Sequence, residues 1–324
     1  MKEGYIPKEE RKTILLLSDD IRTHSGVGTM SKEIVLNTAH HFNWVNIGGA
    51  VKHPEAGKGF DVSEEINKVT GLTDSSVKVI AASGYGDGNL LKSVIKQEKP
   101  DAIVHFTDPR YWIWLYQLEN EIRQKIPMVF YTIWDDIPYP FYNRNFYRSD
   151  DMLLCISKQT KNIVENVLRD HKKEDWAIKY VPHGIDENKF FPVVNDFHFE
   201  AFKEKILGEE EQDFVVLWNS RNIRRKNASD IILAWRTFLG ALPEEKAKKC
   251  TLVMHTEPVD QNGTDLPRVV ETLCDPEKHR VVFSAKKLNE QYLNYLYNIS
   301  DAHMFMTDNE GWGLGLTESL TAGK

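Results

Sequence analysis

The chain has 324 residues, more than one hydrophobic core usually serves, so its length favours two domains. Apolar residues make up 41% and charged residues 27%, a balance typical of globular proteins, which excludes a disordered or fibrous chain. The formal net charge of −7 argues against a broad nucleic-acid footprint, because such footprints are strongly basic.

The cysteines and the start of the chain indicate the cellular setting. Cys155, Cys250 and Cys274 lie far apart and form no CxxC pair, so neither a disulfide framework nor a zinc site is indicated. The polar start lacks the apolar region of a signal peptide, and no apolar run approaches the roughly 20 residues that span a bilayer. We expect a soluble cytoplasmic protein with reduced thiols, and peripheral attachment to a membrane stays open.

The first part of the chain alternates short apolar runs with longer amphipathic stretches. Expected strands cover residues 13–18, 44–47, 77–81, 102–106, 128–133 and 152–156. Expected helices cover residues 30–39, 89–97 and 158–169. This alternation predicts a parallel sheet with helices on both faces.

The alternation then restarts. Expected strands cover residues 214–218, 251–255, 280–283 and 302–306, and expected helices cover 228–239, 266–273 and 289–299. Residues 191–213, of mixed polarity, separate the two sets. We therefore expect an α/β protein with domains at residues 1–192 and 193–324. Ligands of such sheets bind beyond the carboxyl ends of the strands, so we expect a cleft between the domains to hold the site.

A glycine-bearing turn follows the first expected strand. Gly26 and Gly28 precede a helix, where glycine lets the backbone approach a ligand and free N–H groups favour an anion. The stretch is not GxGxxG, and no acidic residue follows the second strand where a nicotinamide cofactor would need it. A turn that serves packing alone is an equal alternative.

A cluster of cations opens the second domain. Arg221, Arg224, Arg225 and Lys226 lie between an expected strand and an expected helix. Cations beside a helix N-terminus oppose the helix dipole, and a bound polyanion would resolve the conflict. Guanidinium and ammonium groups are the usual partners of phosphate oxygens. A solvated run of charges is the alternative.

Glu310 and Glu318 flank alternating glycines in the stretch EGWGLGLTES near the end of the chain. We expect a loop over 308–315 and a helix from Thr317, at the same strand ends as the cations. Small residues and free N–H groups suit a diphosphate, whereas carboxylates accept paired hydrogen bonds from vicinal sugar hydroxyls. The combination describes a nucleotide sugar. The alternative makes Glu318 a first-turn partner of the helix dipole and Glu310 a surface loop residue.

The spacing of these residues resembles a known enzyme family. Arg221 and Lys226, followed by Glu310 and Glu318 eight apart, resemble the pattern of retaining glycosyltransferase family 4. SGVGTM, CISKQTKNIV and VPHGIDENKFFP resemble that family's glycine loop, serine-bearing turn and Pro-Asn-Gly-x-Asp segment, in the family's order. The resemblance implies the GT-B architecture, with two Rossmann-like domains. The second is expected to be incomplete, because the family continues beyond the helix that carries Glu318.

The resemblance also implies roles for individual residues. Arg221 and Lys226 would hold the donor diphosphate, Glu318 the ribose and Glu310 the transferred sugar. His105 matches a histidine near the transferred sugar, although a hydrogen-bonded core residue is the alternative for a lone histidine after a strand. The further donor-binding positions are Gly26, Gly28, Gly311, Trp312, Gly313 and Leu314.

Three positions depart from the family pattern. Trp134 stands where the family often has histidine before Asp135, Ser220 replaces a common glycine before Arg221, and His183 replaces an asparagine. The departure at Trp134 leaves a family role for that position in doubt.

We therefore expect a retaining glycosyltransferase that uses a UDP- or GDP-sugar and needs neither a metal nor another cofactor. The acceptor is not indicated: a carbohydrate, a lipid-linked molecule or another hydroxyl compound fits equally. The aromatic stretch 139–148 is a candidate for the acceptor side, whereas 111–117 suits core packing. Two alternatives stay open, a non-catalytic nucleotide-sugar-binding module and another GT-B enzyme such as a nucleotide-sugar epimerase or a phosphorylase.

Overall fold

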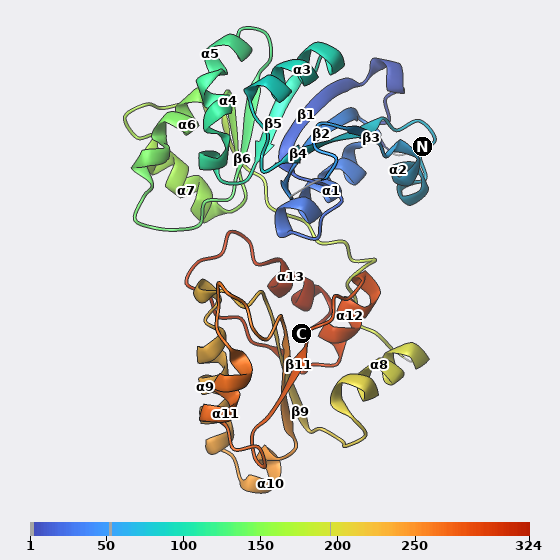
Figure 1. Ribbon diagram of the computed structural model, residues 1–324, viewed down its shortest axis with the longest axis vertical. Coiled ribbons are helices and arrows are strands. Elements are labelled where there is room, and N and C mark those ends of the chain that lie inside the picture. The colour runs from blue at the N-terminus through green and yellow to red at the C-terminus, as the bar shows by residue number, and fades with distance from the viewer. Residues whose placement is uncertain (1–2, 52–53, 195) are drawn as a thin grey trace. The chain divides into compact units, whose positions relative to one another are not determined.

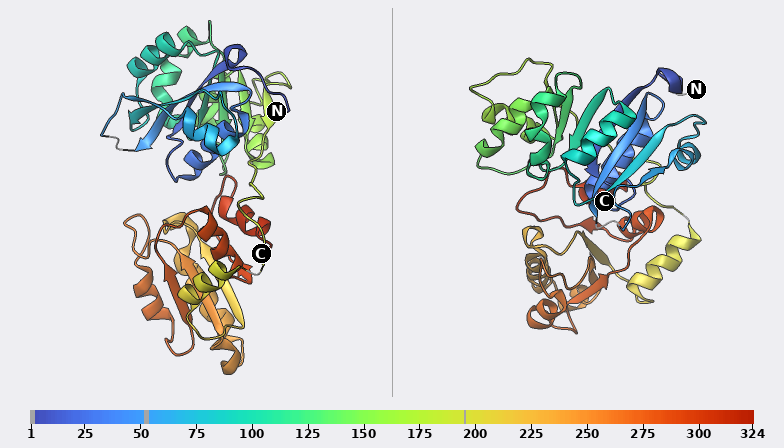
Figure 2. Two further views of the ribbon diagram at one scale, coloured as in Figure 1. Left: turned by 90° about the vertical axis from the view of Figure 1, so that its right-hand side faces the viewer. Right: turned by 45° about the horizontal axis from the view of Figure 1, so that its top comes forward.

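The structure is a computed structural model that describes residues 3–51, 54–194 and 196–324. The chain divides into two compact units, Met1–His183 and Gly184–Lys324. Figure 1 shows that each unit is a sheet with helices on both sides, and the turned views of Figure 2 show the same layering within each unit.

Unit 1 contains an eight-stranded sheet in the order β3-β4-β2-β1-β5-β6-β7-β8. All neighbouring strands are parallel except β3, which pairs antiparallel with β4. The strands are β1 Lys12–Asp19, β2 Phe42–Val51, β3 Gly59–Asp61, β4 Val77–Ser83, β5 Ala102–Phe106, β6 Met128–Thr132, β7 Met152–Cys155 and β8 Ile178–Tyr180.

Helices cover both faces of this sheet. Ile14 and Leu16 of β1 share a core with α1 and α2, whereas Leu15 and Leu17 share another with α3 and α4. A strand buried on both faces needs a continuous apolar run, and Leu15–Leu17 is such a run. The helices are α1 Gly26–Thr38, α2 Ser63–Thr70, α3 Gly88–Glu98, α4 Ile113–Gln117, α5 Glu119–Ile122, α6 Arg144–Ser149 and α7 Lys158–Val167, with 3-10 turns at Lys8–Glu10, Pro109–Trp112 and Phe141–Asn143.

Unit 2 contains a parallel sheet in the order β11-β10-β9-β12. Val216 and Trp218 of β9 pack against α9 and α11 on one face, and Val215 and Leu217 pack against α8 and α12 on the other (Figure 1). The strands are β9 Phe214–Asn219, β10 Cys250–His255, β11 Arg280–Ser284 and β12 Ala302–His303. The helices are α8 Phe197–Leu207, α9 Ala228–Gly240, α10 Glu244–Ala247, α11 Leu266–Leu273, α12 Glu290–Asn298 and α13 Leu314–Thr321, with a 3-10 turn at Arg224–Lys226.

The predicted α/β class with two parallel sheets is confirmed. Two details differ near the end of the chain. The strand expected over 302–306 ends at His303, and the helix expected from Thr317 begins at Leu314. The early start is possible because Gly313, which caps α13, has a φ of 81°, a left-handed conformation that glycine adopts without strain.

The division between the units falls at His183/Gly184, earlier than the expected 192/193. The residues in between pack on unit 2. Phe190 is buried with its ring 5.9 Å from that of Tyr297. The backbone N–H of Phe191 donates to Asn294 Oδ1 at 3.1 Å. Contacts with α12 therefore decide where the second unit begins.

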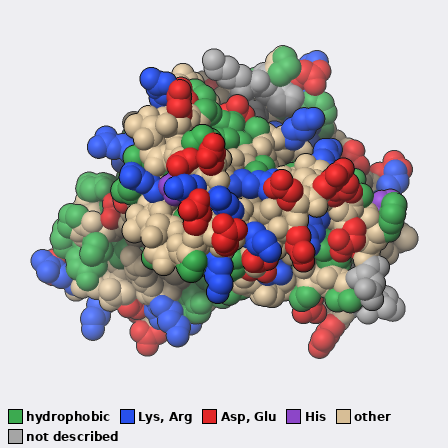
Figure 3. All heavy atoms as spheres, turned by 90° about the horizontal axis from the view of Figure 1, so that it is seen from below, with side chains coloured by type: hydrophobic (Ala, Val, Ile, Leu, Met, Phe, Trp, Pro, Cys, Tyr) green, Lys and Arg blue, Asp and Glu red, His purple; other side chains and the backbone are tan. Residues whose placement is uncertain are grey.

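The cysteines are buried thiols, as the sequence predicts. Cys155, Cys250 and Cys274 are free and buried. Acidic and basic side chains are interspersed over the face drawn in Figure 3. Among the described residues, no helix is both long and apolar enough to cross a bilayer.

Candidate functional site

The loops that follow β9 and β12 are joined by hydrogen bonds. The carbonyl of Arg225 accepts from the N–H of Asp308 at 2.9 Å and from Thr307 Oγ1 at 3.1 Å. Asn227 Nδ2 donates to Asp308 Oδ1 at 2.8 Å. Parallel strands bring their carboxyl ends to one edge of the sheet, so the two loops predicted to bind the donor meet there.

Lys226 is the buried cation of this region, with 8% of its surface exposed. Its ammonium group forms an ion pair with Glu310 Oε2 and lies 5.3 Å from the centre of the Phe305 ring. Arg225 Nη1 lies 3.5 Å from the same oxygen and donates to the carbonyl of Asn309 at 2.7 Å. A solvated charge run is therefore wrong for Lys226, whereas Glu310 lies in a loop with 25% of its side chain exposed, and its role at the transferred sugar stays a prediction.

Arg221 lies nearer to solvent, with 63% of its side chain exposed. Its Nε donates to Asp260 Oδ2 at 3.1 Å, in the loop after β10. A hydrogen bond from the backbone of Asn262, followed by the bond from Arg221, lowers the pKa of Asp260. Asn222 ties the same loop to β9, because its Nδ2 donates to the carbonyl of Thr264 at 2.7 Å.

Glu318 lies on α13 and is held by a tyrosine. Tyr297 Oη donates to Glu318 Oε2 at 2.6 Å, and Asn219 Nδ2 donates to Tyr297 Oη at 2.7 Å. Burial raises the pKa of Glu318. Because α13 begins at Leu314, Glu318 lies beyond its first turn, so the alternative of a first-turn dipole partner is wrong.

A row of aromatic rings connects Glu318 with Lys226. The ring centres of Tyr297 and His303 are 5.8 Å apart, and those of His303 and Phe305 are 6.1 Å apart. Phe305 in turn contacts Lys226. Burial lowers the pKa of His303 to about 4, so its ring is neutral near pH 7. Glu318 and Lys226 therefore belong to one connected set of residues within unit 2.

The start of α13 lies beside Glu310. A Cβ on Gly313 would lie 3.4 Å from Phe305 Cζ and 3.5 Å from Glu310 Cγ. Gly311 and Trp312 are half-buried in the loop just before it, and Leu314 is the first residue of the helix. The N–H groups that begin a helix attract anions, and the role of this stretch at the diphosphate stays a prediction.

Sequence reasoning missed Asn219, Tyr297 and Phe305. Asn219 carries a signal, since it is a polar residue at the carboxyl end of a buried strand. Tyr297 and Phe305 carry none, because an aromatic residue in a helix or after a strand usually belongs to the core. Only the fold places them next to the two glutamates.

The glycine turn of unit 1 is built for packing. The N–H of Gly28 donates to Ser25 Oγ at 2.9 Å, so the Ser25 side chain caps α1. A Cβ on Gly28 would lie 2.3 Å from Thr23 Oγ1 and 2.9 Å from the carbonyl oxygen of Asp20, which leaves room for glycine alone. Gly26 is the first residue of α1. The geometry favours the packing alternative, and a donor contact stays a prediction.

His105 lies in a buried network. It is 0% exposed, stacks on Phe130 with ring centres 4.1 Å apart, and places Nε2 2.7 Å from Tyr116 Oη. Tyr116 Oη donates its proton to Asp150 Oδ2 at 2.9 Å, so His105 Nε2–H is the donor to the hydroxyl. Burial raises the pKa of Asp150. This geometry favours the core-residue alternative, and a catalytic contact stays a prediction.

Asp19 and Asp20, at and after the end of β1, have protein partners. Asp19 accepts hydrogen bonds from Ser25 Oγ at 2.5 Å and Tyr85 Oη at 3.1 Å, and Asp20 pairs with Arg22. Within the described parts of the chain, no group of three or more His, Cys, Asp or Glu side chains is placed to hold a metal ion.

Exposed aromatic side chains follow β5 and β6 of unit 1. Tyr111 is 54% exposed and stacks on Tyr85 with ring centres 4.8 Å apart. Arg110 lies 5.3 Å from the Trp134 ring centre, and Tyr142 packs edge-on against Trp134. Elsewhere in the two aromatic stretches, Trp112, Leu115 and Tyr147 are buried.

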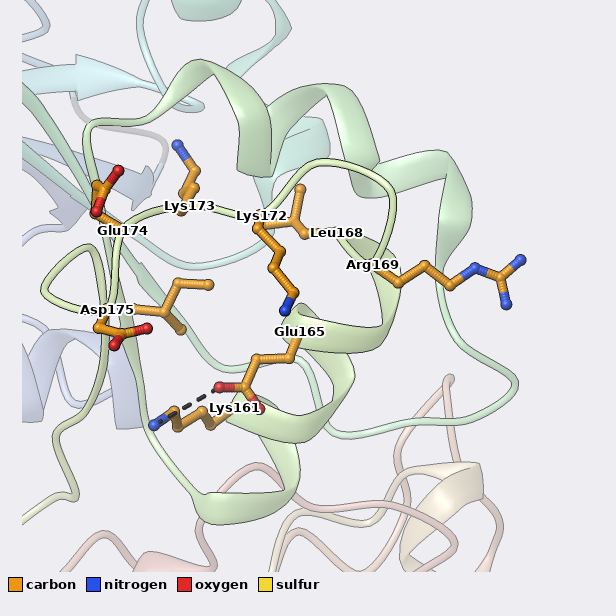
Figure 4. Close-up of a pocket in the computed structure, with 9 residues that line it drawn as sticks. Lys161, Glu165, Leu168, Arg169, Lys172, Lys173, Glu174 and Asp175 are labelled. Atoms are coloured by element: carbon orange, nitrogen blue, oxygen red, sulfur yellow. Dashed lines mark ion pairs between the residues drawn. The ribbon is translucent and has the colours of Figure 1, made fainter.

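A pocket of about 450 Å³ lies elsewhere in unit 1, among α7, the turn after it and Ile178 of β8 (Figure 4). Lysines and an arginine share its lining with three carboxylates, and Lys161 pairs with Glu165 at 3.7 Å. It adjoins the start of β8, away from the carboxyl ends of the strands. We assign it no role.

Comparisons with known proteins identify the fold. No protein-family model and no curated protein sequence matches this chain. A structure from E. coli, described as trehalose-6-phosphate bound with UDP-2-fluoro glucose, has a TM-score of 0.67 at 12% identity, over 96% of this chain and 82% of that one. A sucrose-phosphate synthase from Thermosynechococcus elongatus has a TM-score of 0.64 at 15% identity, over 97% and 80%. An alpha,alpha-trehalose-phosphate synthase (UDP-forming) from Burkholderia vietnamiensis has a TM-score of 0.62 at 11% identity, over 96% and 80%. The chain therefore has the GT-B fold of two Rossmann-like units, as the sequence predicted.

Proposed function

We propose that this protein is a retaining glycosyltransferase that transfers a sugar from a UDP-sugar to an acceptor hydroxyl. The observation that carries the proposal is the buried Lys226 beside Glu310 at the start of α13. Glu318 is joined to it through the aromatic row Tyr297, His303 and Phe305. A phosphate-binding cation next to two acceptors of hydroxyl groups matches the chemistry of a nucleotide sugar.

In this proposal each part of the donor has its own partner. Lys226, Arg221 and the N–H groups at the start of α13 take the diphosphate. Glu318, held by Tyr297, accepts the ribose hydroxyls, and Glu310 accepts hydroxyls of the transferred sugar. His303, which is neutral, adds no further charge between Glu318 and Lys226.

The chemistry then needs charge stabilisation more than a protein nucleophile. The bond between the anomeric carbon and the diphosphate oxygen breaks, and its electron pair goes to that oxygen. The same oxygen takes the proton of the acceptor hydroxyl, whose oxygen bonds to the anomeric carbon on the same face, so configuration is retained. Lys226 and Arg221 stabilise the charge on the departing diphosphate.

The structural neighbours narrow the choice of substrates to test. One of the three structures is described as bound with UDP-2-fluoro glucose. The other two are named as synthases of sugar phosphates, and one of these is also named as UDP-forming. UDP-glucose is therefore our first donor, and hexose phosphates are our first acceptors. On unit 1, the exposed rings of Tyr111 and Tyr142 and the half-buried ring of Trp134 are surfaces against which a sugar can stack. The proposed reaction needs no metal, and the free buried cysteines suit the cytoplasm.

Product analysis tests the proposal against its alternatives. The protein is incubated with UDP-glucose, with and without a panel of hexose phosphates, and released UDP and new sugars are measured. We expect a disaccharide phosphate and UDP only when an acceptor is present. Binding without UDP release would instead indicate a binding module, and a changed sugar nucleotide without acceptor would indicate an epimerase.

A further inference from the structure

Both cations assigned to the diphosphate already have carboxylate partners in unit 2. Lys226 pairs with Glu310, and Arg221 pairs with Asp260. The two pairs differ in burial, since Lys226 has 9% of its side chain exposed and Arg221 has 63%. A lysine this deeply buried needs a counter-ion, because an unpaired buried charge is strongly unfavourable.

The carboxylate of Glu310 occupies surroundings that would suit a phosphate oxygen. Its Oε2 takes the ammonium of Lys226 and lies 3.5 Å from Arg225 Nη1. Its Cγ lies beside Gly313, the residue that caps α13. Two cations thus converge on one anionic oxygen of the protein itself, in a side chain that lies next to the residue capping α13.

The backbone that carries Glu310 is fixed by contacts that do not involve its carboxylate. Arg225 Nη1 donates to the carbonyl of Asn309, and Asp308 is bonded to both Arg225 and Asn227. The Glu310 side chain can therefore leave Lys226 by rotation while its loop stays in place.

We propose that in the unliganded protein the Glu310 carboxylate pairs with Lys226 at the position that the donor diphosphate takes. When the donor binds, its diphosphate displaces the carboxylate from Lys226. The inference rests on the proposed function. The intact donor offers Glu310 new partners, the hydroxyls of its sugar, whereas free UDP displaces Glu310 and offers it none. Glu310 thereby disfavours free UDP relative to the UDP-sugar and assists release of the product.

Calorimetric titration with UDP and with UDP-glucose tests this role. Glu310→Gln removes the competing charge, so UDP should bind on the order of tenfold more tightly, the factor given by about 1.4 kcal/mol. Turnover should fall, because the sugar loses its charged acceptor. Glu310→Asp, too short to keep the full contact with Lys226, should also bind UDP more tightly, by a smaller factor. Glu244→Gln is the matched control, because it removes the same charge from the exposed pair with Lys248 on α10, and its UDP affinity should not change.

The same substitution in a Lys226→Met protein shows whether the diphosphate displaces Glu310 from Lys226 or is only repelled by its charge. If Glu310 only repels the diphosphate, Glu310→Gln will tighten UDP binding equally in a Lys226→Met protein. If Glu310 must be displaced from Lys226, the gain will disappear in that background. Equal or weaker UDP binding by both folded Glu310 variants overturns the inference and leaves the proposed function standing. Absence of UDP and UDP-sugar binding by the unmodified protein overturns the proposed function itself.

Discussion

The ammonium group of Lys226 lies between the Glu310 carboxylate and the Phe305 ring, whereas the neighbouring Arg224 is exposed. The two residues belong to the same 3-10 turn, so their difference in burial comes from the loop after β12 that packs over one of them. A charge kept in such surroundings is preorganised for a developing negative charge, because it does not have to shed water during the reaction.

Lys226→Ala should lower turnover on the order of 10²–10³-fold, the usual cost of removing one preorganised donor of charge stabilisation. Arg224→Ala removes the same charge from the same turn and should change the rate by less than about twofold, as for a surface substitution. Initial rates of UDP release with saturating donor and acceptor measure both. Equal rates for both variants would return Lys226 to a structural role.

Glu318 gives a prediction about pH and stability. Burial raises its pKa above the ordinary value of 4.5, so folding favours the protonated carboxyl. Its contribution to stability is therefore full at pH values below that ordinary pKa and is lost as the pH rises through the folded pKa.

Glu318→Gln should therefore be more stable than the unmodified protein near pH 8, by about 1 kcal/mol, a size typical of replaced functional residues. The difference should disappear near pH 4. Thermal unfolding from pH 4 to 8 measures it, with Glu204→Gln on the exposed surface of α8 as a control. A difference that is constant with pH would mean that the ionisation of Glu318 does not oppose folding.

At the scale of elements, the loops after β9, β10 and β12 hold the proposed donor site together through their own hydrogen bonds. In unit 1, His105, Tyr116 and Asp150 also form a hydrogen-bonded network, in which His105 and Asp150 are fully buried and Tyr116 is partly buried. The proposed donor residues differ from this network in that Arg221 and Glu310 are partly exposed to solvent.

Tyr116→Phe should destabilise the protein by about 1–3 kcal/mol, because it leaves buried polar atoms of His105 and Asp150 without their shared hydroxyl. Affinity for UDP should stay unchanged, since no proposed donor contact is altered. Urea unfolding and calorimetry measure the two quantities. A large loss of turnover in a variant of unchanged stability would favour the catalytic role of His105.

Most elements were predictable from the sequence because their physical causes are local. Buried parallel strands such as β1 and β9 are continuous apolar runs, and Ala102–Phe106 and Leu266–Leu273 have the bounds that were expected. The three-residue strands β3 and β8 were missed, because so short a segment has no periodicity and pairs only when its neighbours are in place.

The site was predictable only in part, for a related reason. Lys226, Glu310 and Glu318 stand out by spacing and charge, whereas Tyr297 looks like any core residue of a helix. Gly28 and His105 match the family pattern in residue type and in order along the chain. Their packing depends on contacts with Thr23 and Tyr116 that no spacing encodes.

At the scale of the whole molecule, the fold alone does not determine the reaction, because one fold hosts many activities. TM-scores of 0.62–0.67 to three solved structures, at identities of 11–15%, show the GT-B fold. The arrangement around Lys226 supports the proposed chemistry, and the products of the reaction decide it.

The most direct test is an NMR time course of the protein with UDP-glucose and a hexose phosphate in the presence of a metal chelator. We expect release of UDP together with a new glycosidic bond that keeps the anomeric configuration of the donor. A product of inverted configuration, a reaction that stops when the metal is removed, or UDP-glucose left unchanged with every acceptor would contradict it.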